Sequence, residues 1–233
     1  MSADELDRWE ESYRRFENHL YWPSDEGVRF VARYLRRRRG LDEFIDVAPN
    51  AKGSRMLDLG CGVGRMLAFG TEMGFEMYGI DLSTVAIDAA RKWIKRIAPD
   101  ASADGRIVAG DVRKLPWADA FFDHAMSESA LDSMPFATAA TGVAEVSRVL
   151  KPGGYFYCSL ISSDQTGYAP DFSGEIIVET QHEQGTIQTF FNRSKIDALF
   201  GGQFDIVQCL LHRIEDRLRG THHSRWFVVG RKR

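Results

Sequence analysis

A glycine-rich loop directly after a short apolar strand constrains this chain more than any other feature. Residues 56–59 read Met-Leu-Asp-Leu, and residues 60–64 read Gly-Cys-Gly-Val-Gly. Glycine has no Cβ, so it adopts positive φ easily and lets a ligand approach the backbone closely. In open α/β sheets, a strand followed by such a loop and a helix forms a ligand-binding edge. The loop therefore predicts an α/β fold with a binding crevice at the strand ends.

Alternating strands and helices continue on the C-terminal side of this loop. Repeated β-α units of this length predict a parallel sheet covered by helices on both faces. The predicted strands are 56–59, 75–80, 106–109, 121–126 and 155–161, and the predicted helices are 65–73, 83–97 and 137–150. Ser83 is expected to cap the second of these helices, because its side chain can accept a hydrogen bond from the first turn.

Different patterns occupy the two ends of the chain. Apolar residues at helical spacing predict a helix over 4–17, and a second helix is expected from an N-cap at Ser24 to a stop at Gly40. Arg36–Arg39 would then be solvated cations at a helix C-terminus, with a basic nucleic-acid patch as the less favoured reading. The C-terminal third predicts a hairpin, a helix and two strands, at 176–183 with 186–191, 192–200, 204–212 and 225–230.

These segments fit one domain covering residues 1–233. We expect a helical N-terminal extension or lid at 1–40 and a cofactor-binding core at 54–161. A substrate-side insertion is expected at 162–191, and a C-terminal helix and strands at 192–233.

The spacing within the glycine loop separates possible cofactors. A dinucleotide fingerprint would need glycine at position 65, where Arg65 stands, and the Gly-Lys-Ser/Thr ending of a P-loop is absent. The strand ends in an acid, Asp58, and is followed by three alternating glycines. In this arrangement the chain resembles the class I, Rossmann-like S-adenosylmethionine-dependent methyltransferases of the small-molecule type. Asp81 and Asp111 end the next two predicted strands, as this resemblance requires.

The resemblance implies a doubly wound, mostly parallel seven-stranded sheet with helices on both faces and an antiparallel C-terminal hairpin. It also implies that Asp81 binds the ribose hydroxyls of S-adenosyl-L-methionine, and that Asp111 binds the adenine amino group. Ser127 would lie near the methionine end. The implied cofactor-binding residues are Asp58, Gly60, Cys61, Gly62, Gly64, Asp81, Leu82, Asp111, Val112 and Ser127.

The predicted activity is methyl transfer to a small molecule whose accepting group, a hydroxyl, amine or carboxylate, stays open. A general base would assist a protonated acceptor. Glu128 and His182 are the principal candidates, with Asp132 and Glu183 beside them. His222 and His223 are weaker candidates, and no further ligands accompany them to form a metal site. Aromatic residues expected to line the acceptor entrance are Tyr13, Tyr21, Trp22 and Tyr168.

Composition limits the alternatives. The formal net charge of −3 argues against nucleic acid as a partner, and no apolar run approaches the roughly 20 residues of a membrane span. The acidic N-terminus is unlike a secretory signal, and Cys61, Cys158 and Cys209 form no disulfide framework, so a cytoplasmic location is expected. A non-catalytic cofactor-binding module and an NAD-dependent oxidoreductase remain alternatives. The oligomeric state stays open.

Overall fold

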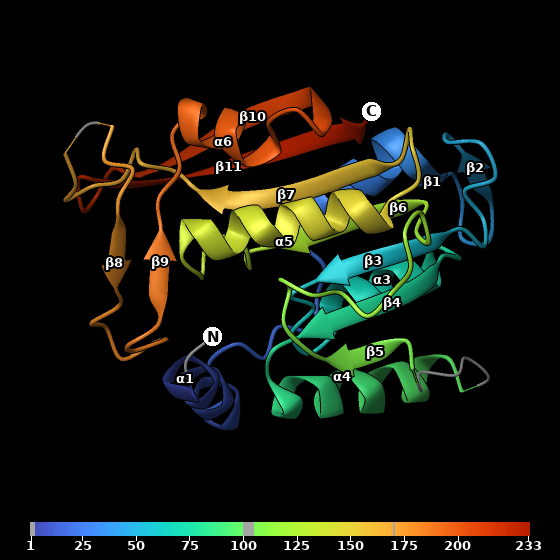
Figure 1. Cartoon of the computed structure of the whole chain (residues 1–233), viewed down its shortest axis with the longest axis horizontal. Helices are drawn as coiled ribbons and strands as arrows, with labels where there is room; N and C mark the ends of the chain where they lie inside the picture. Colours follow the sequence, from blue (N-terminus) through green and yellow to red (C-terminus); the bar gives the residue numbers. More distant parts are fainter. Residues whose placement is uncertain (1–2, 100–104, 170) are drawn as a thin grey trace.

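The computed structural model describes residues 3–99, 105–169 and 171–233, and within these ranges seven strands form a central sheet (Figure 1). The strand order is β10-β11-β7-β6-β3-β4-β5. Pairing from β7 through β6, β3 and β4 to β5 is parallel, whereas β11 is antiparallel to both β7 and β10. The predicted mostly parallel sheet with an antiparallel C-terminal hairpin is confirmed. The bounds are β3 (Arg55–Leu59), β4 (Glu76–Asp81), β5 (Ile107–Ala109), β6 (His124–Glu128), β7 (Tyr155–Ile161), β10 (Phe204–Asp216) and β11 (Thr221–Lys232).

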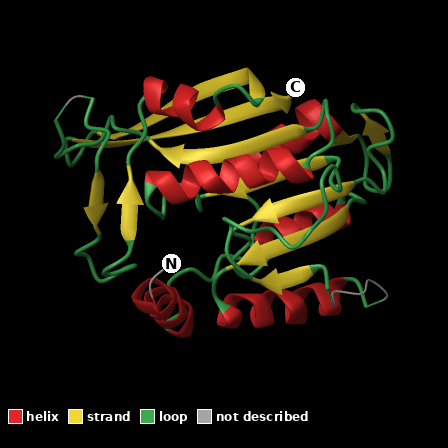
Figure 2. Ribbon diagram, viewed as in Figure 1, coloured by secondary structure: helices red, strands yellow, loops and turns green. Residues whose placement is uncertain are grey.

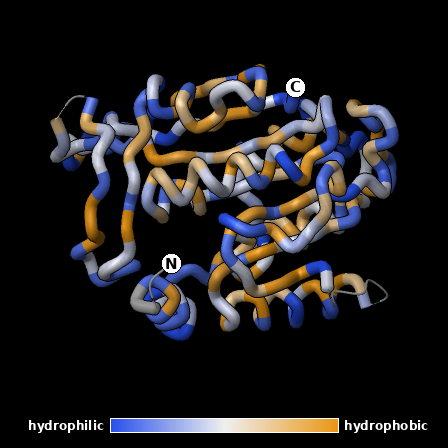
Figure 3. Tube along the Cα trace, viewed as in Figure 1, coloured by the Kyte–Doolittle hydropathy of each residue, from blue (hydrophilic) through white to orange (hydrophobic). Residues whose placement is uncertain are grey.

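Helices cover both faces of this sheet (Figure 2). Successive side chains of a strand point to opposite faces. Accordingly, Leu57 lies in the core beneath α5 and α6, while Met56 lies in the core beneath α2, α3 and α4. Hydrophobic residues are concentrated along the central strands, as both cores require (Figure 3). The helices are α1 (Ala3–Arg14), α2 (Asp25–Phe30), the π-helix η1 (Val31–Leu35), α3 (Arg65–Glu72), α4 (Thr84–Ile97), α5 (Phe136–Val149) and α6 (Arg193–Phe200).

Three predicted helix starts carry side-chain caps in the structure. Ser24 accepts a hydrogen bond from the Gly27 N–H, and Ser83 accepts one from the Ala86 N–H. Asn192 caps α6 through the Lys195 N–H. These short polar side chains satisfy backbone donors that have no partner within the helix.

The arginine run after α2 is a strand and not a helix end, so the prediction of a helix reaching Gly40 is wrong. The helical segment ends at Leu35, and β1 (Arg36–Arg38) pairs antiparallel with β2 (Phe44–Asp46). Arg36 is buried, with its Nη1 atom 3.2 Å from an oxygen of Asp46, and its guanidinium lies over the Phe44 ring. For Arg36, contacts with a segment eight residues further on therefore replace the expected solvation, whereas Arg37, Arg38 and Arg39 are exposed as expected. The 1–40 extension is consequently not helical throughout.

The hairpin predicted around Gln184-Gly185 has the expected partners but much shorter strands. Strand β8 (Glu175–Ile177) pairs with β9 (Ile187–Thr189), and residues 178–186 form a loop between them. The first strand therefore ends at Ile177, well before the expected turn, and Glu183 within the loop has a φ of +58°. By contrast, β10 and β11 extend beyond their predicted bounds on both sides of the turn at 217–220.

Candidate functional site

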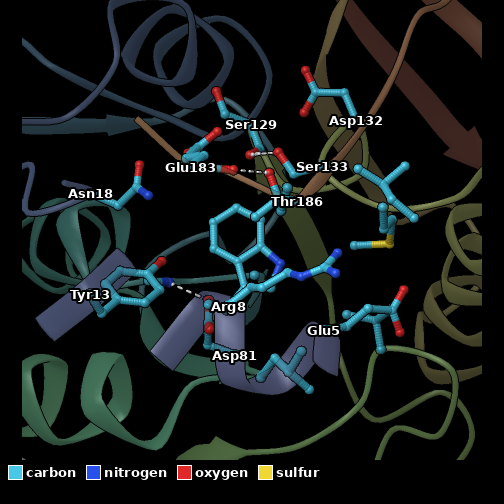
Figure 4. A pocket seen from close by; sticks show the side chains of 18 of the residues that line it. Glu5, Arg8, Tyr13, Asn18, Asp81, Ser129, Asp132, Ser133, Glu183 and Thr186 are labelled. Atoms are coloured by element: carbon cyan, nitrogen blue, oxygen red, sulfur yellow. Dashed lines mark hydrogen bonds between the residues drawn. The ribbon is translucent and has the colours of Figure 1, made fainter. Parts of the chain in front are cut away.

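A cavity of about 470 Å³ lies at the carboxyl edge of the parallel strands (Figure 4). One side, here called the glycine side, consists of residues 60–63, 81–82 and 110–112. The other, here called the hairpin side, consists of residues 128–130, 132–135, 182–183, 185–188 and Arg225. Helix α1 contributes Arg8, Trp9 and Tyr13 between the two sides. The cavity thus lies where open α/β sheets bind ligands.

The glycine loop has the backbone conformation that its sequence predicts. Gly60, Gly62 and Gly64 have φ values of +73°, +52° and +94°. A Cβ atom on Gly60 would lie 2.3 Å from the Cβ of Ala130, and one on Gly62 would lie 2.9 Å from the Tyr13 hydroxyl. Both positions therefore require glycine for space as well as for conformation.

Asp81, at the end of β4, is tied to this loop. Its Oδ2 accepts a hydrogen bond from the Gly62 N–H at 2.9 Å, and its Oδ1 accepts one from the Ser83 N–H at 3.0 Å. Burial raises the pKa of Asp81, although both backbone donors lower it. The carboxylate lines the cavity and fixes the loop at the same time.

Asp111, after β5, is paired with Arg113, which was not among the predicted site residues. The Arg113 guanidinium donates to both carboxylate oxygens, with its Nη2 atom 2.6 Å from Oδ2. These hydrogen bonds hold the pKa of Asp111 below its usual range. Asp111, Val112 and Arg113 all line the cavity. A cofactor amino group at Asp111 would therefore meet a carboxylate already fixed by an arginine.

Three residues predicted to bind cofactor lie behind the cavity wall. Asp58 is 2% exposed, and burial raises its pKa to about 8. Ser127 is fully buried and donates its hydroxyl hydrogen to the Leu59 carbonyl at 2.9 Å. The Cβ position of Gly64 faces Ala90 of α4. Asp58, Ser127 and Gly64 are not among the residues that line the cavity, whereas Gly60, Cys61, Gly62, Asp81, Leu82, Asp111 and Val112 are.

Glu128, at the end of β6, is held by three hydroxyl groups. Its Oε2 accepts hydrogen bonds from Ser24 and Tyr157, each at 2.7 Å, and its Oε1 accepts one from Ser159 at 2.6 Å. Glu128 lines the cavity, but its oxygens already serve as acceptors within the protein. The same contacts join the start of α2 to β6 and β7.

An ion pair that the sequence did not reveal completes the hairpin side. Arg225 of β11 donates from Nη2 to Oδ2 of Asp132 at 2.6 Å, and the same oxygen accepts the Ile161 N–H at 2.7 Å. Both charged side chains line the cavity. In the sequence, Arg225 directly precedes the apolar residues Trp-Phe-Val-Val. A charged residue next to such a strand could have indicated Arg225 as a site residue.

Among the predicted aromatic residues, only Tyr13 lines the cavity. Tyr21 packs edge-on against Trp93, and the Trp22 side chain is 65% exposed. Tyr168 stacks on Phe172 outside the cavity lining. Tyr21, Trp22 and Tyr168 therefore do not line this cavity, since Tyr21 and Tyr168 pack on other rings and Trp22 is exposed.

The candidate histidines are also separated. His182 lies at the cavity, with Nε2 3.6 Å from a carboxylate oxygen of Glu183. His222 instead contacts Asp164, with Nε2 2.9 Å from Oδ1, and neither His222 nor His223 lines the cavity. Within the described ranges, no group of His, Cys, Asp and Glu residues has the arrangement of a metal site. The same residues include no helix with the length and hydropathy of a membrane span.

Helix α1 and the segment after it form hydrogen bonds on both sides of the cavity. Glu10 accepts hydrogen bonds at the start of α4 from Ser83 and Thr84, the shortest at 2.7 Å from the Thr84 hydroxyl. On the hairpin side, Arg8 donates to the Gly185 carbonyl. The Glu183 N–H donates to Glu17 at 3.0 Å. Figure 1 shows α1 beside α4 and near β8 and β9.

Comparison with protein families and curated proteins places the glycine loop in a known domain. A family model described as a methyltransferase domain matches residues 57–158. The 24-methylenesterol C-methyltransferase 2 of Oryza sativa subsp. japonica is 35% identical over 116 residues, which are 49% of this chain and 31% of that protein. The 27-O-demethylrifamycin SV methyltransferase of Amycolatopsis mediterranei is 30% identical over 65% of this chain and 52% of that protein. The chain thus spans about a third to a half of the length of these two relatives.

Solved structures share the fold over most of the chain. The 1,6-didemethyltoxoflavin-N1-methyltransferase of Burkholderia thailandensis, solved with 1,6-didemethyltoxoflavin and S-adenosylhomocysteine, has a TM-score of 0.64 at 20% identity. The alignment covers 99% of this chain and 86% of that one. An S-adenosylmethionine-dependent methyltransferase of Methanosarcina mazei has a TM-score of 0.61 at 23% identity, covering 78% of this chain and 93% of that one. At these identities the likeness establishes the fold alone.

Proposed function

We propose that this protein is a class I, Rossmann-like S-adenosylmethionine-dependent methyltransferase that methylates a small molecule, since residues 57–158 match a methyltransferase domain. The observation that carries the proposal is the glycine loop at one side of the cavity. Its three glycines have positive φ values, and Gly60, Cys61 and Gly62 line the cavity. The two curated relatives named above are a 24-methylenesterol C-methyltransferase and a 27-O-demethylrifamycin SV methyltransferase, which supports a small-molecule acceptor.

The glycine side fits S-adenosylmethionine, which supplies a sulfonium-bound methyl group when it is bound. Any Cβ at Gly60 or Gly62 would narrow the cavity, and the acids Asp81 and Asp111 end adjacent strands beside it. We assign Asp81 to the ribose hydroxyls, Asp111 to the adenine amino group, and Leu82 and Val112 to the walls around them. Asp58 and Ser127 would support this side from behind, through the loop and β3.

The hairpin side would hold the acceptor. The protein's task in methyl transfer is mainly to hold the acceptor atom in line with the methyl carbon and to exclude water. Helix α1 would act as the lid that excludes water, because it is bonded to α4 and to the β8–β9 loop across the cavity. Glu128, held by three hydroxyl groups, would orient the acceptor, and His182, which also lines the cavity, would exchange protons with solvent.

Binding and transfer can be tested in two steps. Isothermal calorimetry should detect binding of S-adenosylmethionine and S-adenosylhomocysteine but not NAD. Incubation with labelled S-adenosylmethionine and metabolite extracts should then label a small molecule. NAD binding without S-adenosylmethionine binding would favour the oxidoreductase alternative. Cofactor binding without transfer to any acceptor would favour the non-catalytic module.

The proposed ribose contact predicts a specific loss of affinity. Asp81→Ala should weaken S-adenosylmethionine binding by about 1.5–3 kcal/mol, since hydrogen bonds to a charged group are lost and the Gly62 N–H is released. Calorimetry measures this change. Asp88→Ala, at an exposed position of α4, is the matched control and should leave affinity unchanged. Equal affinity of Asp81→Ala and the native protein would remove the ribose assignment.

A further inference from the structure

Glu183 has a backbone conformation that its own residue type disfavours. Its φ is +58°, in the left-handed region that costs energy for a residue with a Cβ. The two flanking backbone groups explain how it is held: its N–H donates to Glu17 at 3.0 Å, and its carbonyl accepts the Thr186 N–H and hydroxyl at 3.0 and 2.8 Å. Such conformations persist where surrounding contacts enforce them, and they are concentrated at functional sites.

The side chain that this conformation positions lies at the cavity. The Glu183 carboxylate is 19% exposed, lines the hairpin side, and has Oε1 3.6 Å from Nε2 of the largely exposed His182 (Figure 4 shows Glu183 beside Thr186). The other acids of this side have their carboxylate oxygens engaged by groups of the protein. Both oxygens of Glu128 accept hydroxyl hydrogen bonds, and Asp132 is 3% exposed and paired with Arg225.

We propose that Glu183 accepts the proton of the methyl acceptor, and that the acceptor is therefore a small molecule with an O–H or N–H group and not a carboxylate. This inference rests on the proposed methyltransferase function. The acceptor oxygen or nitrogen forms its bond to the methyl carbon while the carbon–sulfur bond breaks and leaves its electron pair on sulfur. The acceptor proton moves to a Glu183 oxygen and leaves to solvent through His182. Because Glu17 holds the Glu183 backbone, the proton acceptor is in place only when the lid segment is docked.

The charges around Glu183 suit this role. Burial raises its pKa above the ordinary 4.5, opposed by His182 and Asn18 and assisted by Asp132 and Glu17. A carboxylate with a raised pKa is the stronger proton acceptor. The charged or titratable groups around this part of the cavity come from α1 and the segment after it, the β6 loop, the β8–β9 loop and β11, and they include Arg8, Tyr13, Glu17, Asp132, His182 and Arg225.

Two substitutions at this position separate chemistry from structure. Glu183→Gly should raise the melting temperature by about 2–4 °C, because glycine adopts this φ without strain. Glu183→Gln should leave it within 2 °C. Both should keep the affinity for S-adenosylhomocysteine measured by calorimetry. A fall in melting temperature of Glu183→Gly by several degrees would show that the side chain is there for stability and would overturn the proposal.

Turnover of the acceptor found in the labelled-methyl screen provides the catalytic readout. Glu183→Gln should lower kcat about 100-fold or more while KM changes less than threefold, as expected for loss of a general base. The rise of kcat with pH should disappear in this variant. Glu179→Gln, in the same loop but outside the cavity lining, is the matched control and should behave as the native protein. A Glu183→Gln kcat within threefold of native, or an acceptor methylated on a carboxylate, would refute the assignment.

A titration of the protein with bound S-adenosylhomocysteine requires no acceptor at all. The carbon-13 resonance of the Glu183 carboxyl, assigned by its loss in Glu183→Gln, should titrate above pH 4.5. A midpoint at or below 4.5 would overturn the proposal. Absence of S-adenosylmethionine binding by the native protein would instead refute the proposed function itself, so the two failures are distinguishable.

Discussion

The two sides of the cavity are built from contacts of very different range. On the glycine side, residues 60–63, 81–82 and 110–112 each directly follow a strand of one parallel sheet. On the hairpin side, Arg8 meets Gly185 across 177 positions of sequence, Glu17 meets Glu183 across 166, and Arg225 meets Asp132 across 93. Local sequence thus sets the geometry of the first side, whereas the tertiary fold sets that of the second. The glycine side should accordingly be intolerant of single local changes, and the hairpin side should depend on whether α1 is docked.

The largest effect is expected from the glycine loop. Gly60→Ala should lower the free energy of unfolding by about 3 kcal/mol, because a left-handed alanine is strained and its Cβ would lie 2.3 Å from that of Ala130. Urea unfolding measures this loss, and calorimetry should show that S-adenosylmethionine binding is lost as well. Gly53→Ala is the matched control, since Gly53 has a φ of +77° with no atom within 4 Å of the added Cβ. It should lose only about 1 kcal/mol. Equal losses in the two variants would mean that the approach to Ala130 does not constrain the loop.

The same contrast explains which elements were predictable from the sequence. The core strand β7 was predicted with its observed bounds, 155–161, and α3, α4 and α5 were predicted to within two residues. Their apolar periodicity and capping residues act within one element. Ser24, Ser83 and Asn192 belong to this class, because a cap acts on the next three residues.

The predictions that differ from the structure concern residues whose partners are distant in the sequence, or whose side chains could pack at more than one site. Arg36 belongs to a strand because Phe44–Asp46 supplies a partner strand, a carboxylate and an aromatic ring. Tyr168 packs on Phe172 and Phe190 in place of the cavity. Composition carries no information on either choice. Arg225 was missed for the same reason, since its partner Asp132 lies on another part of the chain.

A second, smaller effect tests whether the lid joins the two sides. Glu10→Ala should cost about 1–2 kcal/mol of stability, because it removes charge-assisted hydrogen bonds to Ser83 and Thr84 at the start of α4. We expect faster proteolysis within the first 20 residues and faster release of S-adenosylmethionine, measured by stopped flow. Glu11→Ala, whose exposed side chain pairs with Arg15, is the control and should show neither change.

A low pH should weaken the contact between Glu10 and the start of α4. Burial tends to raise the pKa of Glu10, but hydrogen bonds from Thr84, Val85 and Ser83 outweigh it and lower the pKa. A carboxyl group with a lowered pKa contributes stability above its ordinary pKa, and this contribution is lost as the pH falls through the folded-state value. Proteolysis of the native N-terminus should therefore accelerate below pH 4.5, whereas the Glu10→Ala variant should show little further change. If both proteins respond alike, Glu10 is not the group that fastens α1.

A gradual change of stability with pH is expected from Asp58, behind the glycine side. Burial raises the pKa of Asp58 to about 8, with a smaller opposing effect from Arg65. In the unfolded chain the group ionises near 3.8, so between pH 3.8 and about 8 only the folded state retains the proton. Its contribution to stability is complete below pH 3.8 and is lost progressively as the pH rises to about 8.

Asp58→Asn, which has no proton to lose, should gain stability relative to the native protein by about 1 kcal/mol per pH unit over this window. Urea unfolding at pH 5, 6.5 and 8 measures the difference, with the exposed Asp88→Asn as control. A difference that does not change with pH would mean that Asp58 is ionised in the folded protein, and that the glycine loop rests on a buried carboxylate in place of a neutral acid.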